Sequence, residues 1–442
     1  YPTAPIWKSD YPQEDADTAL RNVSRPASVY VHIPFCVANC TFCGCNMVVA
    51  GIRSPGTRYL DNLERYVASL PLPAEQIEVS RIHLGGGTPT WLTSAELTRL
   101  YKILHSRFQP IAGAEISVEA DPEITTDEQV QTLADLGVNR LSMGVQSFDA
   151  TVLEAINRPQ EHTRVHSIMA NARELGMGSM NLDLIYGLPH QTLERFEETL
   201  TKTLEMRPDR LAVFGYAHVP WIKFYQRSID ADALPGPIER IELFLLAHKM
   251  LGEAGYQAIG MDHFALRDDE LAVAQTEQRL HRNFMGYTTQ PDLELIGLGM
   301  SAISEFHGSY VQHRAKLSHW WEAMEQGASL IEKGRTLTAE DQLRREVINR
   351  LMCNLVLPFE AVESRHEIRF SQHFAKELAE LETFEKEGLL ERRADGIHIT
   401  QMGRFLIRNI CMVFDAHLTR KPGTDDLSTK QQVGQPRFSQ TV

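Results

Sequence analysis

The sequence alternates short apolar runs rich in β-branched residues with amphipathic segments of helical length, and this alternation most narrows the folds open to the chain. The apolar runs predict strands at 29–35, 81–86, 114–120, 139–145, 179–187 and 209–218. The segments between them predict helices at 57–70, 93–108, 125–137, 162–176 and 192–206. Strands that alternate with helices require right-handed crossovers and a parallel sheet. We therefore expect an α/β fold, a partial (β/α)6 TIM-like barrel with its chemistry at the carboxyl ends of the strands.

An arm is expected before this barrel, and an extension after it. Residues 1–28 contain several prolines without sustained periodicity, which predicts an N-terminal arm that lies over the main body. From its position alone, we hypothesise that this arm covers the barrel mouth. Residues 29–235 are the expected barrel core. Residues 236–339 are the expected barrel extension and connecting region, in which 235–255 predict a helix and 256–264 a strand.

The pattern changes again near residue 340, where a second domain is expected. Helical patterns at 341–356 and 374–391 precede an Asp395-Gly396 turn between two extended segments, which predicts a hairpin. A further helix is expected at 402–418. Residues 340–442 therefore predict a mainly helical, winged-helix-like C-terminal domain with a polar, poorly ordered tail from residue 419.

Four of the six cysteines crowd into one loop directly after the first predicted strand: Cys36, Cys40, Cys43 and Cys45. A chain of 442 residues with its own core needs no disulfide staple, and clustered thiols in such a chain more often bind metal or carry redox chemistry. Structural zinc usually takes four protein ligands, and no second Cys or His pair is placed to complete a site, although zinc and a disulfide remain alternatives. Three thiolates from Cys36, Cys40 and Cys43 suit a four-iron cluster with one iron open, and Cys45 is then surplus.

Other candidate residues stand at the ends of the next predicted strands. The glycines of the Gly85–Thr88 turn allow a ligand to approach backbone N–H groups, although a tight turn alone would also need them. Glu119 and Asp183 end apolar strands, where a buried acid needs a partner, so each is either a structural ion pair or a ligand contact. Gln146 and Arg158 follow the fourth strand and complete a ring around one barrel mouth.

Charge and hydropathy exclude several classes of function. Lys and Arg total 44 against 58 Asp and Glu, a net charge of −14, which disfavours nucleic-acid binding as the main function. An acidic ligand would need a local basic pocket. No apolar run reaches the roughly 18 residues of a membrane span, and no secretory signal is visible, so a cytoplasmic protein is expected.

Taken together, the motifs resemble one enzyme family. They are YVHIPFC, CTFCGCN, GGGTPT, EADP, RLSMGVQSF, INRPQ, NLDLIYGLP, YAHVP, GMDHFA, HRNF-x-GYTT, GLGMSAIS and RNICM, which cover the chain to about residue 416. The x3, x2 cysteine spacing resembles that of the radical S-adenosylmethionine (SAM) superfamily. The whole set resembles oxygen-independent coproporphyrinogen III oxidases. Two related groups share the barrel and cluster, the haem chaperones and the haem-degrading radical SAM methyltransferases, and they remain the alternatives.

The resemblance implies a reaction and its cofactors. Two propionate side chains of coproporphyrinogen III would be oxidatively decarboxylated to vinyl groups, giving protoporphyrinogen IX in haem biosynthesis. The implied cofactors are a [4Fe-4S] cluster on Cys36, Cys40 and Cys43 and two SAM molecules. The implied electron donor is a protein such as flavodoxin or ferredoxin, and the enzyme would be a monomer that binds no nucleic acid.

The resemblance also implies roles for individual residues. Tyr30, Gly86 and Glu119 would contact the first SAM molecule, and Tyr30, His32 and Glu119 would act closest to the chemistry. The residues expected around the second SAM molecule are Phe42, Gly87, Thr88, Gln146, Arg158, Asp183, Ala217 and Ile303.

The acidic substrate needs cations at the barrel mouth, for which the candidates are Arg158, Arg267 and Arg282. Phe284 is a candidate for stacking on a ring of the substrate or cofactor. Met285 stands where some family members have Gln, so a polar role there does not transfer to this chain.

Overall fold

The computed structural model describes residues 1–51, 54–290 and 293–418. One mixed sheet runs through the molecule in the order β16-β15-β14-β13-β1-β4-β5-β6-β7-β8-β10-β9. Its centre is parallel from β13 to β8. The parallel strands are β1 (Ala27–Ile33), β4 (Ile77–Gly86), β5 (Phe108–Ala120), β6 (Arg140–Gln146), β7 (Ser179–Tyr186), β8 (Arg210–Gly215) and β13 (Leu295–Leu298).

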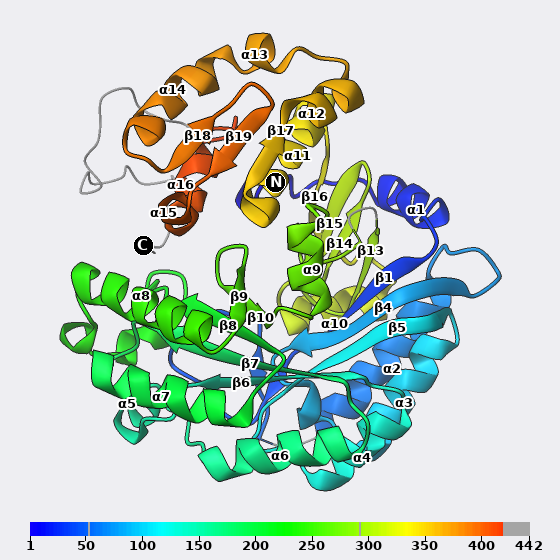
Figure 1. The fold of residues 1–442 in the computed structure, drawn as a ribbon. Coiled ribbons are helices and arrows are strands. Elements are labelled where there is room, and N and C mark those ends of the chain that lie inside the picture. Colours follow the sequence, from blue (N-terminus) through cyan, green and yellow to red (C-terminus); the bar gives the residue numbers. More distant parts are fainter. Residues whose placement is uncertain (52–53, 291–292, 419–442) are drawn as a thin grey trace.

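The expected alternation of strands and helices is confirmed. Every predicted barrel strand is present, and Figure 1 shows the helices that connect them along the outer side of the sheet. These helices are α2 (Ser54–Ser69), α3 (Ser94–His105), α4 (Asp127–Asp135), α6 (His162–Glu174) and α7 (Leu193–Met206). The short helix α5 (Ala150–Ala155) and the parallel strand β13 were not anticipated.

Local sequence explains where the barrel helices begin. Thr93 accepts a hydrogen bond from the Glu96 backbone N–H at 3.2 Å, and the Glu96 carboxylate accepts one from the Thr93 N–H at 2.9 Å. Thr126 and Gln129 repeat this reciprocal arrangement at the start of α4. Each capping box satisfies donors that the first helical turn leaves without partners, which orients the helix against its strand.

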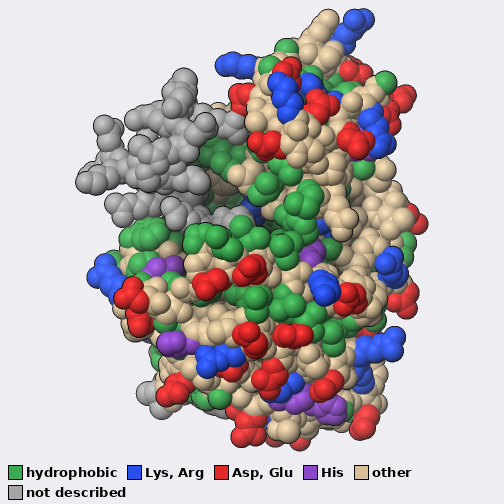
Figure 2. All heavy atoms as spheres, turned by 60° about the vertical axis from the view of Figure 1, so that its left-hand side comes forward, with side chains coloured by type: hydrophobic (Ala, Val, Ile, Leu, Met, Phe, Trp, Pro, Cys, Tyr) green, Lys and Arg blue, Asp and Glu red, His purple; other side chains and the backbone are tan. Residues whose placement is uncertain are grey.

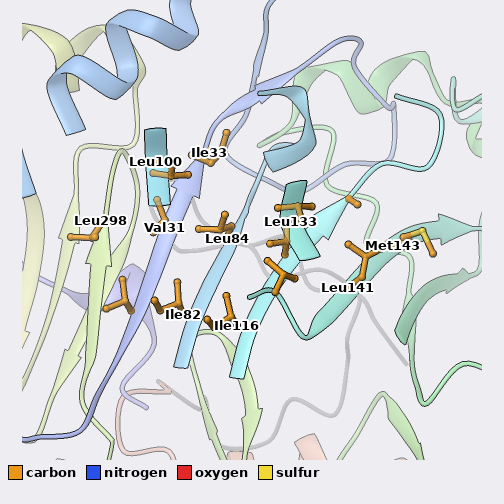
Figure 3. Packing of buried hydrophobic residues seen from close by; sticks show 14 of the residues in the cluster. Val31, Ile33, Ile82, Leu84, Leu100, Ile116, Leu133, Leu141, Met143 and Leu298 are labelled. Atoms are coloured by element: carbon orange, nitrogen blue, oxygen red, sulfur yellow. The ribbon is translucent and has the colours of Figure 1, made fainter. Parts of the chain in front are cut away.

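The main core lies between the parallel sheet and its outer helices. Figure 3 shows Leu100 of α3 and Leu133 of α4 directed at strand side chains such as Val31 and Leu84, all of which are fully buried. Removing a buried side chain of this size, as in Leu84→Ala, typically costs about 2–5 kcal/mol of stability. The core therefore holds the strand ends, and the residues that follow them, in fixed positions.

The amino ends of the strands are joined by a buried ion network. Glu115 of β5 accepts from Arg81 of β4 at 2.7 Å and from Arg140 of β6 at 3.1 Å, and it lies 3.7 Å from Arg210 of β8. Arg210 also pairs with Asp269 at 2.6 Å. One carboxylate thus links four strands at the end of the barrel opposite the expected site.

Antiparallel strands extend the sheet at both edges. Next to β13 lie β14 (Ile303–Phe306), β15 (Ser309–His313) and β16 (Ile331–Thr336), and next to β8 lies a hairpin of β10 (His263–Leu266) and β9 (Tyr256–Ile259). The prediction of a single strand at 256–264 is therefore wrong. The chain reverses at Gly260, whose φ is +57° and where a Cβ would lie 2.0 Å from the Tyr287 hydroxyl, so only glycine fits.

The N-terminal arm contains more regular structure than its prolines predicted. It forms a short helix at Ala4–Ile6 and the helix α1 (Gln13–Arg21). Between them, Lys8 pairs with Gly334 of β16, and the Trp7 ring stacks on Tyr310 of β15 at a centroid distance of 5.2 Å. The arm thus lies over the main body, as expected.

The C-terminal domain packs above the sheet (Figure 1). It comprises α11 (Ala339–Asn354), α12 (Phe359–His366), α13 (Phe370–His373), α14 (Ala375–Lys386), α15 (Gln401–Phe405), α16 (Ile407–Met412) and the three short strands β17 (Val356–Pro358), β18 (Leu390–Arg392) and β19 (Gly396–Ile399). The predicted hairpin is confirmed, because Arg392 pairs with Ile397 across the Asp395-Gly396 turn.

The single helix predicted at 402–418 is wrong. It breaks at Leu406, so that Ile410 enters the domain core while Arg404 reaches the Ala258 carbonyl of β9 at 2.6 Å. The predicted polar tail from residue 419 lies outside the described residues.

Helix α8 (Pro237–Glu253) confirms the helix expected at 235–255 and lies where the barrel and the C-terminal domain approach each other. Figure 2 shows hydrophobic side chains gathered in a band between these two parts. Exposed apolar residues on the elements concerned are Ile238, Ile241, Leu245, Met402 and Met412. Within the described residues, none of the helices has the length and apolarity that a bilayer span demands.

Candidate active site

A cavity of about 290 Å³ opens at the carboxyl ends of β1, β4 and β5. Tyr30 and His32 come from β1, Gly86 ends β4, and Glu119 lies near the end of β5. Ile303 of β14 contributes to the wall from the antiparallel extension. The cavity therefore lies where a parallel barrel normally places its chemistry.

The cysteine loop begins beside this cavity and is held by the turn after β4. The backbone N–H of Gly87 donates to the Ile33 carbonyl at 2.8 Å. A Cβ at Gly87 would lie 2.7 Å from the Pro34 carbonyl oxygen. The glycine is thus required because the cysteine loop passes against it. This close backbone approach was not anticipated, since the sequence pattern was interpreted as space for a ligand.

Each of the three motif cysteines has a donor group near its sulfur. The Thr88 hydroxyl lies 3.4 Å from Cys36 Sγ, the Arg158 guanidinium donates to Cys40 Sγ at 3.4 Å, and the Cys45 backbone N–H donates to Cys43 Sγ at 3.4 Å. A hydrogen bond with the Cys45 thiol is the largest influence that lowers the pKa of Cys43, to about 6, against the opposing effect of burial.

These sulfurs are of the kind that iron–sulfur clusters take as ligands. Thiolates are the ligands of such clusters, and hydrogen bonds to the sulfurs tune them. Within the described ranges, no group of three or more His, Cys, Asp and Glu side chains converges on a point where one ion would be held.

Three side chains of the segment after β8 hold the cysteine loop from outside. Lys223 donates to the Cys45 carbonyl at 2.9 Å, Gln226 donates to the Phe42 carbonyl at 3.1 Å, and the Tyr225 hydroxyl donates to the Cys43 carbonyl. These contacts were not predicted, because no sequence pattern in residues 223–226 indicates a partner about 180 residues away.

Glu119 presents an ionised carboxylate to the cavity. The Glu119 side chain is 44 % exposed. Protein surrounds the residue, but its carboxylate oxygens face the open cavity. It accepts hydrogen bonds from the Gly86 N–H at 3.1 Å and from His83 Nε2 at 3.3 Å. Burial is the largest influence and raises the pKa of Glu119, but His83 and the Gly86 N–H outweigh it, so the pKa is lowered. Such a carboxylate suits a cationic amino group.

Tyr30 and His32 form a pair on the same face of β1. The Tyr30 hydroxyl lies 3.0 Å from His32 Nδ1, and His32 Nε2 lies 2.8 Å from the Asn46 carbonyl. The carbonyl can only accept, so Nε2 carries the proton and Nδ1 accepts from Tyr30. Burial lowers the pKa of His32, which keeps the ring neutral. His32 therefore orients Tyr30 and ties it to the cysteine loop.

Arg158 and Asp183 lie deeper in the barrel. Arg158 pairs with Asp121 at 3.3 Å and donates to the Gly144 carbonyl at 2.6 Å, in addition to its contact with Cys40. Asp183 accepts from Asn181 at 2.8 Å. Burial, and then the charge of Glu119, raise the pKa of Asp183 to about 6. Glu119 and Asp183 are thus two carboxyl groups of one site with pKa values shifted in opposite directions.

Comparison with known proteins decides the family. The chain matches the Radical SAM superfamily over residues 30–202 and the HemN C-terminal domain over residues 337–406. Oxygen-independent coproporphyrinogen III oxidase of Escherichia coli is 44% identical over 423 residues, which cover 95% of this chain and 92% of the relative. The protein of the same name from Synechocystis is 41% identical over 429 residues. This chain belongs to the oxygen-independent coproporphyrinogen III oxidase family.

The fold of this oxidase family extends through both parts of the chain. The solved structure of coproporphyrinogen III oxidase from Escherichia coli, described as a radical SAM enzyme, superposes with a TM-score of 0.91 at 44% identity. The superposition covers 95% of this chain and 96% of that one. The α/β fold and the family expected from the motifs are therefore confirmed.

The structure divides the residues expected in the oxidase site into two groups. Tyr30, His32, Gly86, Glu119 and Ile303 line the cavity. The others lie around the cysteine loop or deeper among the strand ends: Phe42, Gly87, Thr88, Gln146, Arg158, Asp183 and Ala217.

Phe42 and Ala217 have local partners, and Gln146 has an unusual backbone conformation. Phe42 packs against an apolar cluster that includes Ile156 and Tyr216. The Ala217 carbonyl accepts from Gln226 at 3.2 Å, and Gln146 takes a left-handed φ of 69° where β6 ends. Their roles toward a second SAM molecule stay predictions.

Three arginines were expected as cations at the mouth of the oxidase barrel. Arg282 lies in β11 (His281–Asn283), two residues before Phe284, which lines the cavity. Arg158 lies at the cysteine loop and is ion-paired, as described above. The placement of Arg267 at the mouth is wrong: it follows the end of β10 that pairs with Arg210, at the amino end of β8. The strand that precedes Arg267, β10, runs antiparallel to β8, which the sequence did not reveal.

Phe284 lines the cavity with Met285, and its ring packs edge-on against Trp7 at a centroid distance of 5.5 Å. Stacking of Phe284 on a ligand ring stays a prediction.

Proposed function

We propose that this chain catalyses the oxygen-independent oxidative decarboxylation of coproporphyrinogen III. Two of the four propionate side chains would become vinyl groups, and the product would be protoporphyrinogen IX of the haem pathway. The observation that carries this proposal is the cavity itself, where Glu119, Tyr30 and His32 meet a loop of three cysteines in a chain 44% identical to a named oxidase.

Cys36, Cys40 and Cys43 would hold a [4Fe-4S] cluster, and two SAM molecules would bind beside it. When bound and reduced, these groups would supply a carbon-centred radical, which is the chemistry needed to take a hydrogen atom from a propionate β-carbon so that the side chain can release carbon dioxide and pass one electron to an acceptor. The protein positions these groups and excludes water. The sulfur contacts of Thr88, Arg158 and the Cys45 N–H would stabilise thiolate charge on the three ligands.

The cavity residues have separate tasks in this proposal. The Glu119 carboxylate would accept hydrogen bonds from the amino group of the first SAM molecule, with Gly86 at the same wall and Tyr30 fixed by His32. The residues proposed around the second SAM molecule are Phe42, Gly87, Thr88, Gln146, Arg158, Asp183, Ala217 and Ile303. Its carboxylate and amino groups have matching partners in Arg158 and Asp183.

An anaerobic assay tests the function. The reconstituted enzyme receives reductant, SAM and coproporphyrinogen III, and 5′-deoxyadenosine and tetrapyrrole masses are measured together. We expect successive loss of two carboxyl groups coupled to SAM cleavage. SAM cleavage with an unchanged tetrapyrrole would contradict the proposal and favour a haem chaperone, whereas methyl transfer to haem would favour the degrading enzyme.

The cysteine loop offers a matched pair of variants for the cluster ligands. We expect Cys36→Ala to lose the cluster absorbance in the visible spectrum together with activity, because two thiolates remain for three irons. Cys45→Ala keeps all three proposed ligands and the backbone N–H to Cys43, so its cluster absorbance should remain. If Cys36→Ala retained a full cluster while Cys45→Ala lost it, the ligand assignment would be wrong.

We further propose that the enzyme acts as a monomer in the cytoplasm. An electron carrier such as flavodoxin or ferredoxin would reduce the cluster. The exposed position of Cys45 supports reduction by a separate carrier protein, because the cysteine loop reaches the surface at which an electron would arrive.

A further inference from the structure

An exposed apolar segment lies against the outside of the cysteine loop. It follows β8, comprises residues 219–228 and ends in a short helical turn at Phe224–Ser228, and we call it the aromatic loop. Phe224 is 65 % exposed, Ile222 is 56 % exposed, and Trp221 is exposed as well. Three large apolar side chains within four residues of one surface segment mark a place where another molecule binds.

Hydrogen bonds hold the backbone of the aromatic loop in one shape. The buried Gln226 side chain accepts from the Val219 N–H at 2.6 Å and donates to the Ala217 carbonyl at 3.2 Å. The N–H groups of Ile222 and Lys223 both donate to the Val219 carbonyl, at 2.9 and 3.0 Å. The apolar side chains thus project from an ordered backbone, and their exposure is a property of the fold.

The aromatic loop contacts the cysteine loop at a proposed cluster ligand. The Tyr225 hydroxyl donates to the backbone carbonyl of Cys43, and Lys223 donates to the Cys45 carbonyl at 2.9 Å. The active-site cavity is lined by Gly44 and Cys45 but by none of residues 219–228, all of which the structure describes. The cysteine loop is therefore approached from two directions, through the cavity and across the aromatic loop.

The charge of this surface differs from that of the rest of the chain. Residues 34–60 and 210–229 contain no Asp or Glu, although these two residue types total 58 in a chain of 442. The aromatic loop carries Lys223 and the exposed Arg227, whose guanidinium lies 4.7 Å from the centre of the Phe224 ring. A cationic and apolar surface on a protein of net charge −14 is complementary to an acidic partner.

We propose that the aromatic loop is the docking surface for a small acidic electron-carrier protein. This inference rests on the proposed function, in which the cluster receives one electron for each SAM molecule cleaved. A carrier protein cannot enter a cavity of about 290 Å³, so it must approach the cysteine loop from outside. One electron leaves the docked, reduced carrier, which is oxidised, and reduces the cluster across the contact between Tyr225 and Cys43.

The composition of the aromatic loop suits a brief encounter. Interfaces of electron-transfer partners are small, below about 1,200 Å², so a few side chains must supply most of the binding energy. Aromatic residues and arginine are the types that most often do so, and Phe224 and Arg227 lie against each other here. The positive charge raises the rate of encounter and makes it sensitive to salt.

The test measures carrier binding and electron transfer in the absence of tetrapyrrole. Reconstituted protein with SAM is mixed anaerobically with reduced flavodoxin or reduced ferredoxin, and the visible absorbance of the carrier gives its oxidation rate. Titration calorimetry with the oxidised carrier gives Kd. We expect Phe224→Ala to raise Kd about tenfold, which corresponds to about 1.4 kcal/mol. Arg227→Glu should slow carrier oxidation about tenfold at low salt but not near 1 M salt, where the Debye length is about 3 Å.

Three further variants serve as controls. Arg227→Lys keeps the positive charge and should keep the wild-type dependence on salt. Lys376→Glu on α14 makes the same change of charge in the C-terminal domain, and Met402→Ala on α15 removes another exposed apolar side chain. Neither should change Kd for the carrier or its oxidation rate.

Several outcomes would overturn the docking surface. One is a wild-type protein that binds neither carrier, and another is unchanged Kd and rate in both Phe224→Ala and Arg227→Glu. Equal slowing of cluster reduction by dithionite, which needs no docking surface, would indicate a disturbed cysteine loop instead. A raised KM for coproporphyrinogen III with unchanged carrier binding would assign the aromatic loop to the tetrapyrrole.

The proposed function fails in a different way. If the wild-type protein oxidises the carrier and its variants respond as expected, but coproporphyrinogen III is left unchanged, the docking surface stands and the substrate assignment is wrong.

Discussion

At the scale of single residues, the two carboxyl groups of the site respond to pH in opposite directions. Asp183 has a folded-state pKa of about 6 against an ordinary value of 3.8, so its contribution to stability is complete below about 3.8 and is lost as pH rises through 6. Between pH 4.5 and 7.5, we expect the free energy of unfolding of Asp183→Asn to rise by about 2–3 kcal/mol relative to that of the wild type. Urea unfolding at several pH values, without SAM, measures this.

The control for this experiment is Glu78→Gln, which changes an exposed carboxyl on β4. Its stability curve should run parallel to that of the wild type. If the plot of stability against pH for Asp183→Asn also ran parallel to that of the wild type, Asp183 would be ionised in the folded protein at no cost in free energy. That result would contradict the effect of its burial.

At the scale of elements, the barrel strands depend on one carboxylate. Glu115 of β5 faces Arg81, Arg140 and Arg210 from three other strands. Glu115→Gln would leave these buried cations without their shared partner, and breaking a buried ion pair in this way costs about 3–5 kcal/mol. We expect a correspondingly lower midpoint in urea, again against Glu78→Gln. A loss below 1 kcal/mol would show that Arg210 is satisfied by Asp269 alone and that the network is dispensable.

At the scale of the whole molecule, Asn354 is one of several residues that join the C-terminal domain to the barrel extension. Asn354 at the end of α11 accepts from the Leu280 N–H at 3.0 Å and donates to the Leu280 carbonyl at 3.0 Å. Asn354→Ala leaves both buried backbone groups without partners, at a cost of about 2–4 kcal/mol. Limited proteolysis should then release the C-terminal domain earlier than in wild type. Unchanged cleavage kinetics would locate the attachment elsewhere.

Sequence patterns predicted the structural features that depend on residues close to one another in the sequence. Apolar alternation located the barrel strands and their helices, and the Cys36–Cys43 spacing marked the cysteine loop at the end of the first strand, because both are local signals. The hairpin at Gly260 was missed because its apolar run continues through the turn.

Features formed by distant segments escaped prediction for a different reason. Arg408 of α16 lies 4.0 Å from Asp262, in the turn between β9 and β10, only because the C-terminal domain folds onto the barrel extension. The contacts of Lys223 and Gln226 with the cysteine loop have the same origin. No periodicity in the sequence marks such residues, since nothing around each one differs from an ordinary helix or loop.

The position of β1 in the sheet has a consequence for synthesis on the ribosome. One edge of this strand pairs with β4, about 50 residues later, but its other edge pairs with β13 (Leu295–Leu298), more than 250 residues later. At about 5–20 residues per second, the second partner emerges tens of seconds after the first. Throughout that interval, the strand that leads into the cysteine loop presents an unpaired edge, a template for wrong pairing. The nascent chain thus exposes its cluster-binding end longest, and the same delay leaves that loop open to the machinery that delivers iron and sulfur.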